Sequence, residues 1–432
     1  MDSGILIGCI ADDFTGAGDA ASFLREGGLR TLLLGGIPAE AVDAGGFQAV
    51  VIALKTRTMP RCEAVRMSLE AADWLTARGA AQLYFKYCST FDSTREGNIG
   101  PVVDALLERT GQRGVLLCPS LPVNRRTVRL GRLYVDDVPL DESSMKNHPL
   151  TPMWDSRIPV LMREQGRYPC VVLERETLRG TAEEVRGQAE KLAEGSGHFY
   201  IVPDYETDED AGLIVGAFGD DRLLTGGSGL LKELAKKWVG EQRRDVLPGG
   251  SRPGRKRTLL LAGSCSAMTL KQIAWYQRLG LAAVKIRPED VLEGKWDERH
   301  IREALEAAGD GPALFYSSDL PEAVDRAVAL GGRGVSGEFE AVFARLAALA
   351  YAQGFRNFIV AGGETSGAAA QALGFHAFEI GDSAAPGVPV LVPVQAPDVR
   401  LILKSGNFGA EDFLEKAIRL VSGGQEGTDA RG

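Results

Sequence analysis

The sequence predicts an α/β protein of two domains, each a mainly parallel β-sheet flanked by helices. Short apolar, β-rich runs alternate with longer helical patterns along the chain, which is typical of βαβ units. A stretch at 241–257 that is rich in Pro, Gly and Arg separates two such blocks and predicts a linker. The length of 432 residues agrees with two or three domains.

The first block predicts an N-terminal domain over residues 1–240, and the second a C-terminal domain over residues 258–421. The strands expected in the first block are 5–10, 31–36, 49–54, 83–88, 114–120 and 200–204, with helices at 17–26, 62–79 and 182–195. In the second block, strand-and-loop patterns occur at 258–266, 312–318, 357–367 and 400–409, with a helix at 267–280. The tail, 422–432, is predicted to be disordered.

Composition excludes several classes of protein. The net charge is −9, and the short basic run at 255–257 lies in the predicted linker, which argues against a nucleic-acid-binding protein. No apolar run approaches the roughly 18 residues of a membrane span, and the N-terminus reads as a first strand rather than a signal peptide. Six cysteines without a CxxC pair indicate free thiols in a reducing cytoplasm, and with only four histidines a zinc site is not expected.

The first candidate site is the pair Asp12 and Asp13, which follows the first predicted strand and precedes a helix. Ligands of open α/β sheets collect at the carboxyl ends of the strands. Two carboxylates at that place can activate a hydroxyl group or help to hold Mg²⁺. The alternative is that one of them only caps the next helix, but capping needs one Asp and not two.

The string at 16–19, Gly-Ala-Gly-Asp, also occurs in ribokinase-type sugar kinases. In that family it stands late in the chain, whereas here it stands at the start. We therefore interpret residues 16–19 as part of a scaffold helix.

The second candidate site is the polar stretch 86–98, which begins with Lys86 at the end of a predicted strand. It offers a cation and many hydrogen-bonding groups to an acidic, hydroxylated substrate. The alternatives are a polar loop that caps the next helix, and a Lys86 that pairs with a local carboxylate such as Asp92. Cys88 is interpreted as a packed thiol rather than a nucleophile, because no histidine is near it in sequence.

Weaker candidates follow other strands. Arg57 could bind a carboxylate with its planar guanidinium. The run 124–127 is a similar case, and His148 is either a proton carrier or part of a rigid loop.

Three loops of the C-terminal block, 263–266, 362–367 and 404–409, combine Gly with Ser or Thr after a strand. Such loops present bare N–H groups and hydroxyls to a phosphate. None is a Walker A loop, but three of them in one domain indicate a nucleotide site. A fourth loop, 225–229, stands before the linker and could face the cleft between the domains.

Seven ordered motifs between about residues 5 and 418 resemble the four-carbon acid sugar kinase family: ADDFTGAGD, YFKYCSTFDSTREGNIGPV, NHPLTPM, TGGSGL, GSCS, GGETSGA and LKSGNFG. The long second motif and NHPLTPM look most like the 3-oxo-tetronate 4-kinase branch. One departure is the run 121–127, where Val123 and Arg125 replace the usual Glu and Gly, so substrate specificity could differ.

The resemblance implies an N-terminal domain that binds the sugar acid and a C-terminal domain that binds ATP, with the active site in the cleft between them. It implies Mg-ATP-dependent phosphorylation of the C4 hydroxyl, most simply of 3-oxo-tetronate, with D-threonate or D-erythronate as alternatives. Asp13 is expected as the base, with Asp12 orienting the hydroxyl or holding Mg²⁺. The substrate residues would be Arg57, Lys86, Tyr87, Cys88 and Ser89. The ATP residues would be Ser264, Gly362, Gly363, Glu364, Thr365 and Gly406.

Two other functions agree less well with the sequence. A non-catalytic sugar-acid or nucleotide sensor would gain nothing from two adjacent carboxylates, and a nicotinamide dehydrogenase needs a GxGxxG at the first strand, which residues 5–19 lack. We expect a cytoplasmic kinase whose partners are a sugar acid and ATP, with no nucleic acid or membrane partner. An assembly of identical chains is left open.

Overall fold

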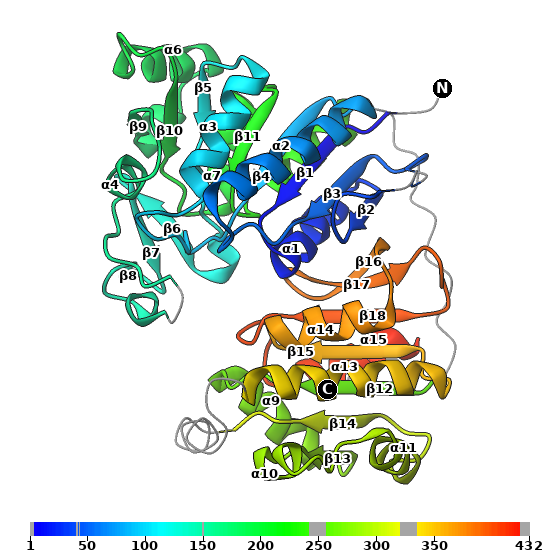
Figure 1. Ribbon diagram of the computed structural model, residues 1–432. Coiled ribbons are helices and arrows are strands. Elements are labelled where there is room, and N and C mark those ends of the chain that lie inside the picture. Colours follow the sequence, from blue (N-terminus) through cyan, green and yellow to red (C-terminus); the bar gives the residue numbers. More distant parts are fainter. Residues whose placement is uncertain are drawn as a thin grey trace, which may run out of the picture. The chain divides into compact units, whose positions relative to one another are not determined.

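The computed structural model describes residues 4–39, 42, 44–148, 151–241, 256–319 and 335–423. The chain divides into two compact units, Met1–Leu247 and Pro248–Gly432. Most elements of the two units are labelled in Figure 1. Residues 242–255 of the predicted linker and 424–432 of the predicted tail lie outside the described residues.

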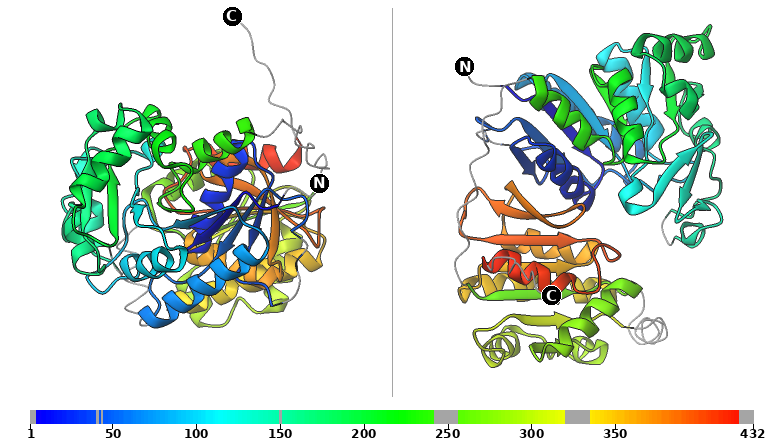
Figure 2. Two further views of the ribbon diagram at one scale, coloured as in Figure 1. Left: turned by 90° about the horizontal axis from the view of Figure 1, so that it is seen from above. Right: turned by 180° about the vertical axis from the view of Figure 1, so that it is seen from behind.

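The first unit is built on a parallel sheet of five strands in the order β11-β4-β1-β3-β2. The strands are β1 (Ile7–Ala11), β2 (Thr31–Leu34), β3 (Ala49–Ala53), β4 (Gln82–Lys86) and β11 (Leu223–Gly226). The helices are α1 (Phe14–Glu26), α2 (Arg61–Ala77), α3 (Ile99–Thr110) and α8 (Leu231–Glu241). Helices α1 and α8 pack together on one face, and α2 and α3 on the other (Figure 2). Both faces are therefore covered, which is why these strands read as continuous apolar runs.

The rest of the first unit contains two smaller sheets. One is parallel, in the order β5-β10-β9, and the other is antiparallel, in the order β6-β7-β8. Their strands are β5 (Gly114–Leu116), β6 (Arg126–Arg129), β7 (Arg132–Val135), β8 (Val138–Pro139), β9 (Cys170–Leu173) and β10 (Phe199–Pro203). The helices are η1 (Pro122–Asn124), η2 (Ser144–Asn147), α4 (Ile158–Arg163), α5 (Arg175–Leu178), α6 (Ala182–Leu192) and α7 (Asp208–Phe218). The antiparallel sheet was not predicted, because its strands are too short to show a period.

The second unit has a seven-stranded sheet in the order β16-β17-β18-β15-β12-β14-β13. Five strands are parallel, and β17 runs antiparallel to both β16 and β18. The strands are β12 (Thr258–Ala262), β13 (Ala282–Lys285), β14 (Ala313–Tyr316), β15 (Asn357–Ala361), β16 (Ala377–Ala385), β17 (Val388–Pro393) and β18 (Arg400–Lys404). The helices are α9 (Ala267–Arg278), α10 (Pro288–Leu292), α11 (Glu298–Ala307), α13 (Val335–Ala352), α14 (Gly363–Leu373) and α15 (Phe413–Ser422).

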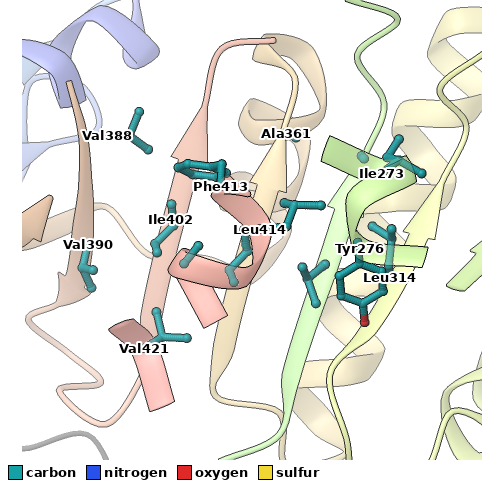
Figure 3. Packing of buried hydrophobic residues seen from close by; sticks show 14 residues of the cluster. Ile273, Tyr276, Leu314, Ala361, Val388, Val390, Ile402, Phe413, Leu414 and Val421 are labelled. Carbon is teal, nitrogen blue, oxygen red and sulfur yellow. The ribbon is translucent and has the colours of Figure 1, made fainter. Parts of the chain in front are cut away.

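One face of the second sheet is covered by α9 and α15 (Figure 3). Alternate strand residues point to this face, such as Leu260 and Ala262 of β12, and Ile359 and Ala361 of β15. Phe413 and Leu414 of α15 pack on them. This alternation confirms the prediction of a sheet buried on both faces, since α13 and α14 contact strands of the same sheet.

The ends of neighbouring strands lie in register in both units. In the first unit, Ala11 of β1 pairs with Ala53 of β3 and with Lys86 of β4. In the second unit, Ala361 of β15 pairs with Ala262 of β12 and with Lys404 of β18. The loops that follow these residues therefore leave each sheet side by side. The prediction of two α/β units, each with a mainly parallel sheet flanked by helices, is confirmed. No helix within the described ranges has the length and hydropathy needed to cross a membrane.

Candidate active site

The strand ends of the first unit bring three candidate residues together. Asp12 directly follows β1, and its N–H donates to the Lys86 carbonyl at 3.0 Å. The N–H groups of Thr56 and Arg57 donate in turn to the Asp12 carbonyl, at 3.0 and 3.3 Å. Backbone hydrogen bonds thus tie Asp12, Arg57 and Lys86 into one cluster, although 74 positions separate the first from the last.

Arg57 is the centre of the acidic part of this cluster. Its Nε and Nη2 donate to Oδ2 and Oδ1 of Asp12, both at 2.9 Å, in the bidentate geometry that favours Arg over Lys. Nη2 also lies 3.0 Å from Asp13 Oδ1, and Nη1 lies 3.6 Å from Asp92 Oδ2. Burial alone would lower the pKa of Arg57, but the carboxylates of Asp12 and Asp13 raise it well above its ordinary value. Arg57 therefore remains charged.

Asp12 and Asp13 differ in exposure and in partners. Asp12 is 5% exposed, and both of its carboxylate oxygens accept from Arg57. Burial raises the pKa of Asp12, and Arg57 opposes that shift. The Asp13 side chain is 31% exposed, and its Oδ1 caps α1 by accepting from Gly16 N at 2.9 Å. Asp13 is thus both a helix cap and the more accessible of the two carboxylates.

The loop that carries Arg57 is held from behind by Asn98. The side-chain amide of Asn98 donates to the carbonyls of Thr56 at 2.7 Å and Met59 at 2.8 Å. Asn98 is buried and lies one residue before α3. The sequence offered no signal for this role, because a buried amide is recognised only by its partners.

Lys86 is 4% exposed, and its ammonium lies beside α1. The carboxylate that pairs with it is Asp19, with Nζ 4.0 Å from Oδ2, so the alternative of an ion pair within the protein is met by Asp19 and not by Asp92. Gly16 makes the approach possible, because a Cβ at this position would stand 2.6 Å from Lys86 Nζ and 2.3 Å from Asp13 Oδ1. Asp19, Asp13 and Asp12 raise the pKa of Lys86 against the opposing effect of burial.

Asp19 is a site residue that the sequence analysis assigned to the scaffold. It is 5% exposed, accepts a hydrogen bond from Ser228 Oγ through Oδ2, and leaves its buried Oδ1 without a partner in the described part of the chain. Burial raises its pKa from 3.8 to about 6, and Lys86 opposes the shift. The signal that could have revealed Asp19 is an acidic residue in the segment 17–24, whose other residues are small or apolar.

The stretch after Lys86 folds as a compact polar turn. Thr90 Oγ1 donates to Asp92 Oδ1 at 2.7 Å and lies 3.0 Å from Cys88 Sγ. Burial raises the pKa of Cys88 to about 12, which agrees with a packed thiol and not with a nucleophile. The Tyr87 ring is wholly buried and packs edge-on against Phe91, and its buried hydroxyl has no hydrogen-bond partner in the described part of the chain. Its role as a substrate residue stays a prediction.

Phe91 holds a left-handed conformation, with φ of 60°, which is uncommon for a bulky residue and marks a constrained turn. Ser89 is half-buried on the same turn. A Cβ added at Gly227 would stand 3.4 Å from the Cβ of Ser89. The turn therefore packs on the loop 225–229.

The loop 225–229 belongs to the packing of the first unit. Side chains at Gly226, Gly227 and Gly229 would stand within 2.5 Å of the carbonyls of Cys118, Pro119 and Ser120. Its glycines allow this close approach, and Ser228 reaches Asp19 as described.

The three predicted loops of the second unit converge in a similar way. Gly362 N donates to the Lys404 carbonyl at 2.9 Å, and Gly362 has a φ of 132° that only glycine adopts readily. A Cβ at Gly263 would stand 2.1 Å from Thr365 Oγ1, and one at Gly406 would stand 2.2 Å from Ser264 Oγ. The glycines thus let the hydroxyls of neighbouring loops fit against the backbone.

The start of α14 is open. Gly363 and Glu364 are exposed, and a Cβ at Gly363 would meet nothing within 4 Å. No side chain caps this helix, so the N–H groups of its first turn are available to an anion. Thr365 by contrast is buried, with its hydroxyl turned towards Gly263.

The two weaker candidates, His148 and the run 124–127, make contacts within the protein. His148 Nδ1 accepts from Thr151 N at 3.1 Å and lies 2.8 Å from the Thr151 hydroxyl, which favours the rigid-loop interpretation. In the run 124–127, Arg125 is exposed and pairs with Asp136 and Asp137. Residues 149 and 150 of the NHPLTPM motif lie outside the described residues.

The residues present do not form a ready cation site. No group of three or more His, Cys, Asp or Glu side chains in the described ranges is arranged to hold a metal ion. Both oxygens of Asp12 are committed to Arg57, so the expectation that Asp12 could hold Mg²⁺ does not fit this geometry.

The family of the chain follows from comparison with known proteins. Residues 7–234 match the model of a sugar-binding N-terminal domain, and residues 259–414 match that of a nucleotide-binding C-terminal domain. Together these matches cover most of the chain. The chain belongs to the four-carbon acid sugar kinase family.

Individual relatives resemble the chain over nearly its whole length. A 3-oxo-tetronate kinase of Brucella melitensis biotype 1 is 42% identical and covers 98% of this chain and 96% of its own. One from Haemophilus influenzae is 40% identical and covers 95% of this chain and 99% of its own. A solved Salmonella typhimurium LT2 structure, described as a tRNA synthase, has 40% identity and a TM-score of 0.87, covering 96% of this chain and 99% of its own.

Proposed function

We propose that this protein is a 3-oxo-tetronate kinase, which transfers the γ-phosphoryl group of ATP to the C4 hydroxyl of a four-carbon keto sugar acid. The observation that carries the proposal is the strand-end cluster of the first unit, where an accessible carboxylate, Asp13, stands beside a buried ammonium, Lys86. It occurs in a chain 42% identical to a 3-oxo-tetronate kinase over 98% of its length.

Asp13 is the proposed base. It takes the proton of the C4 hydroxyl while the hydroxyl oxygen forms a bond to the γ-phosphorus, and the bond from that phosphorus to the leaving ADP oxygen breaks. Its exposed side chain favours it over Asp12, whose two oxygens are engaged by Arg57. Asp12 is then the residue that holds Arg57 in place.

Lys86 is the proposed ligand of the substrate carboxylate. No hydrogen bond from its ammonium is found within the described ranges, and the nearest carboxylate oxygen is 4.0 Å away. Its N–H donors therefore lack acceptors within the described ranges and can be used by a substrate carboxylate. Arg57 contributes less than expected, because Nε and Nη2 serve Asp12 and Asp13 and Nη1 lies 3.6 Å from Asp92 Oδ2. Cys88 and Ser89 line the same turn and are half-buried.

The nucleotide is proposed to bind in the second unit. Ser264, Gly362 to Thr365 and Gly406 lie on the three convergent loops, where the open first turn of α14 offers N–H groups to phosphate. Magnesium is expected as the counter-ion of the ATP phosphates, since Mg²⁺ usually keeps several waters and few protein ligands. Such an ion does not require a group of three or more protein carboxylates, and none is found in the described ranges.

The proposed compartment is the cytoplasm. All six cysteines lie within the described residues and are free thiols, which suits a reducing environment.

The test is an ATP-dependent screen of four-carbon acids with coupled detection of ADP. We expect turnover with 3-oxo-tetronate well above that with D-threonate or D-erythronate, and a 4-phosphate product identified by mass spectrometry. A preference for threonate or erythronate would move the protein to another branch of the family. Binding of a sugar acid or nucleotide without turnover of any acid would favour a sensor.

A further inference from the structure

Lys404 is the last residue of β18 and lies in the row of strand ends of the second unit. It is in register with Ala361, and its carbonyl accepts from Gly362 N at 2.9 Å. It is therefore bonded directly to the loop that opens α14. The side chain is completely buried.

The ammonium of Lys404 is enclosed by oxygen atoms of neutral groups. Nζ donates to the carbonyls of Gly406 at 2.8 Å and Ser405 at 3.1 Å, and lies 3.4 Å from Thr269 Oγ1. The Phe413 ring lies 5.6 Å away on another side. Thr269 Oγ1 itself donates to Gly406 O at 2.9 Å, so towards Lys404 it is an acceptor. Three acceptors match the three N–H donors of a protonated amine.

No carboxylate pairs with Lys404 within residues 256–319 and 335–423. The acidic groups on the elements around it are engaged or exposed elsewhere. Glu411 pairs with Lys271 at 3.0 Å, Glu415 pairs with Arg419, and Glu364 is exposed at the start of α14. Asp412, next to Phe413, pairs through Oδ2 with Lys416 at 3.0 Å. Burial lowers the pKa of Lys404 to about 7, and no neighbouring charge opposes this shift.

Lys86 at the corresponding place of the first unit shows the contrast. Asp19, Asp13 and Asp12 raise its pKa, so its charge is balanced within the protein. Burying an unpaired charge is costly, and such a charge is retained where a ligand supplies the opposite sign. A nucleoside polyphosphate is an anion of that kind.

We propose that Lys404 is a positioning residue of the nucleotide site. Its ammonium holds the turn at Ser405 and Gly406 by their carbonyls and adds the buried positive charge that makes the site prefer nucleoside polyphosphates to nucleosides. This inference rests on the proposed function in one respect, that the nucleotide binds in the second unit.

The test compares binding of ATP, ADP, AMP and adenosine to the native protein and to Lys404→Met by calorimetry. We expect the variant to lose roughly 10–100-fold in affinity for ATP and ADP, less for AMP, and less than about threefold for adenosine, because a charge contributes only while its partner charge is present. Lys404→Arg, which keeps the charge, should recover most of the affinity for ATP. Lys285→Met removes an exposed charge from the same unit and should change none of these constants.

A pH series gives a second readout. Between about pH 7 and 9 the affinity of the native protein for ADP should fall relative to that of Lys404→Arg, because the lysine loses its proton in this range and the guanidinium does not. Equal slopes for the two proteins would contradict the proposal.

Two outcomes overturn the inference while leaving the proposed function intact. One is an unchanged affinity of Lys404→Met for ATP. The other is an equal loss of affinity for ATP and adenosine, which would mean that Lys404 contributes only packing. An unchanged KM for the sugar acid shows that the variant is folded. If it is not folded, the Lys404→Arg pH series decides. Failure of the native protein to bind ATP would instead contradict the proposed function itself.

Discussion

The two parallel N–H groups of Arg57 meet the two carboxylate oxygens of Asp12 at 2.9 Å each. This pairing separates two adjacent aspartates by role. Both carboxylate oxygens of Asp12 accept hydrogen bonds from the guanidinium, whereas Asp13 keeps a partly exposed side chain at the start of α1. A kinase base must reach the substrate hydroxyl, so of the two aspartates we propose Asp13 as the base.

The first prediction separates these roles by mutation. Asp13→Asn should lower kcat by about 10²–10⁴-fold with little change in stability, because the amide can still cap the helix but cannot take a proton. Asp12→Ala should lower the thermal midpoint, because removing one partner of a buried ion pair costs roughly 3–5 kcal/mol of stability. Arg57 retains Asp13 as a partner, so we expect a loss at the lower end of that range. A kcat near the native value in Asp13→Asn would assign the base to another residue.

The second prediction concerns the contact of Gly16 with Lys86. In Gly16→Ala the new Cβ would stand 2.6 Å from Lys86 Nζ and 2.3 Å from Asp13 Oδ1, so kcat/KM for the sugar acid should fall by at least tenfold. Gly18→Ala is the matched control on the same helix, because a Cβ there meets nothing within 4 Å. It should leave activity unchanged and stabilise the helix by about 0.5–1 kcal/mol. Equal activity of the two variants would remove Gly16 from the site.

The third prediction tests whether Lys86 binds the substrate carboxylate. Lys86→Met should cost much of kcat/KM with the acid but little more with an analogue whose carboxylate is replaced by a neutral group. The two changes should be strongly non-additive, because each removes the same charge-assisted contact. The measurement is kcat/KM of both enzymes on both ligands. Equal fold-losses would mean that Lys86 serves stability alone.

The fourth prediction concerns the open start of α14. Gly363→Val should raise KM for ATP far more than KM for the sugar acid, because the site for the new side chain is open space beside the first-turn N–H groups. Gly367→Val, one turn further along the same helix and also without neighbours within 4 Å, is the control and should leave KM for ATP nearly unchanged. The reverse pattern of KM values would show that the two ligand sites were assigned to the wrong units.

The fifth prediction follows from the raised pKa of Asp19. In the folded protein its pKa is about 6, whereas the ordinary value is 3.8, so the folded state binds the proton more tightly. The contribution of Asp19 to stability is therefore fully present below pH 3.8 and is lost as the pH rises through about 6. This contribution is at most about 3 kcal/mol. Asp19→Asn should remove this slope from the pH dependence of the thermal midpoint. Asp137→Asn, an exposed control, should retain it.

The class of fold and the places where chemistry could occur can be predicted from the sequence alone. Buried parallel strands appear as apolar runs such as 49–54, and polar residues directly after them mark the carboxyl edge of a sheet. Asp12, Asp13, Arg57 and Lys86 were found in this way, as were the loops around Gly362 and Gly406. These signals are local, so a single sequence contains them.

Which of these residues contact one another depends on the packing of the folded chain. The pair of Arg57 with Asp12 spans 45 positions, and that of Ser228 with Asp19 spans 209, so no local pattern reports either. The same holds for charge. Lys86 and Lys404 both end a strand, but one is surrounded by carboxylates and the other by carbonyls. The physical reason is that a buried ionisable group takes its properties from neighbours in space, and the packing of distant strands and helices selects those neighbours.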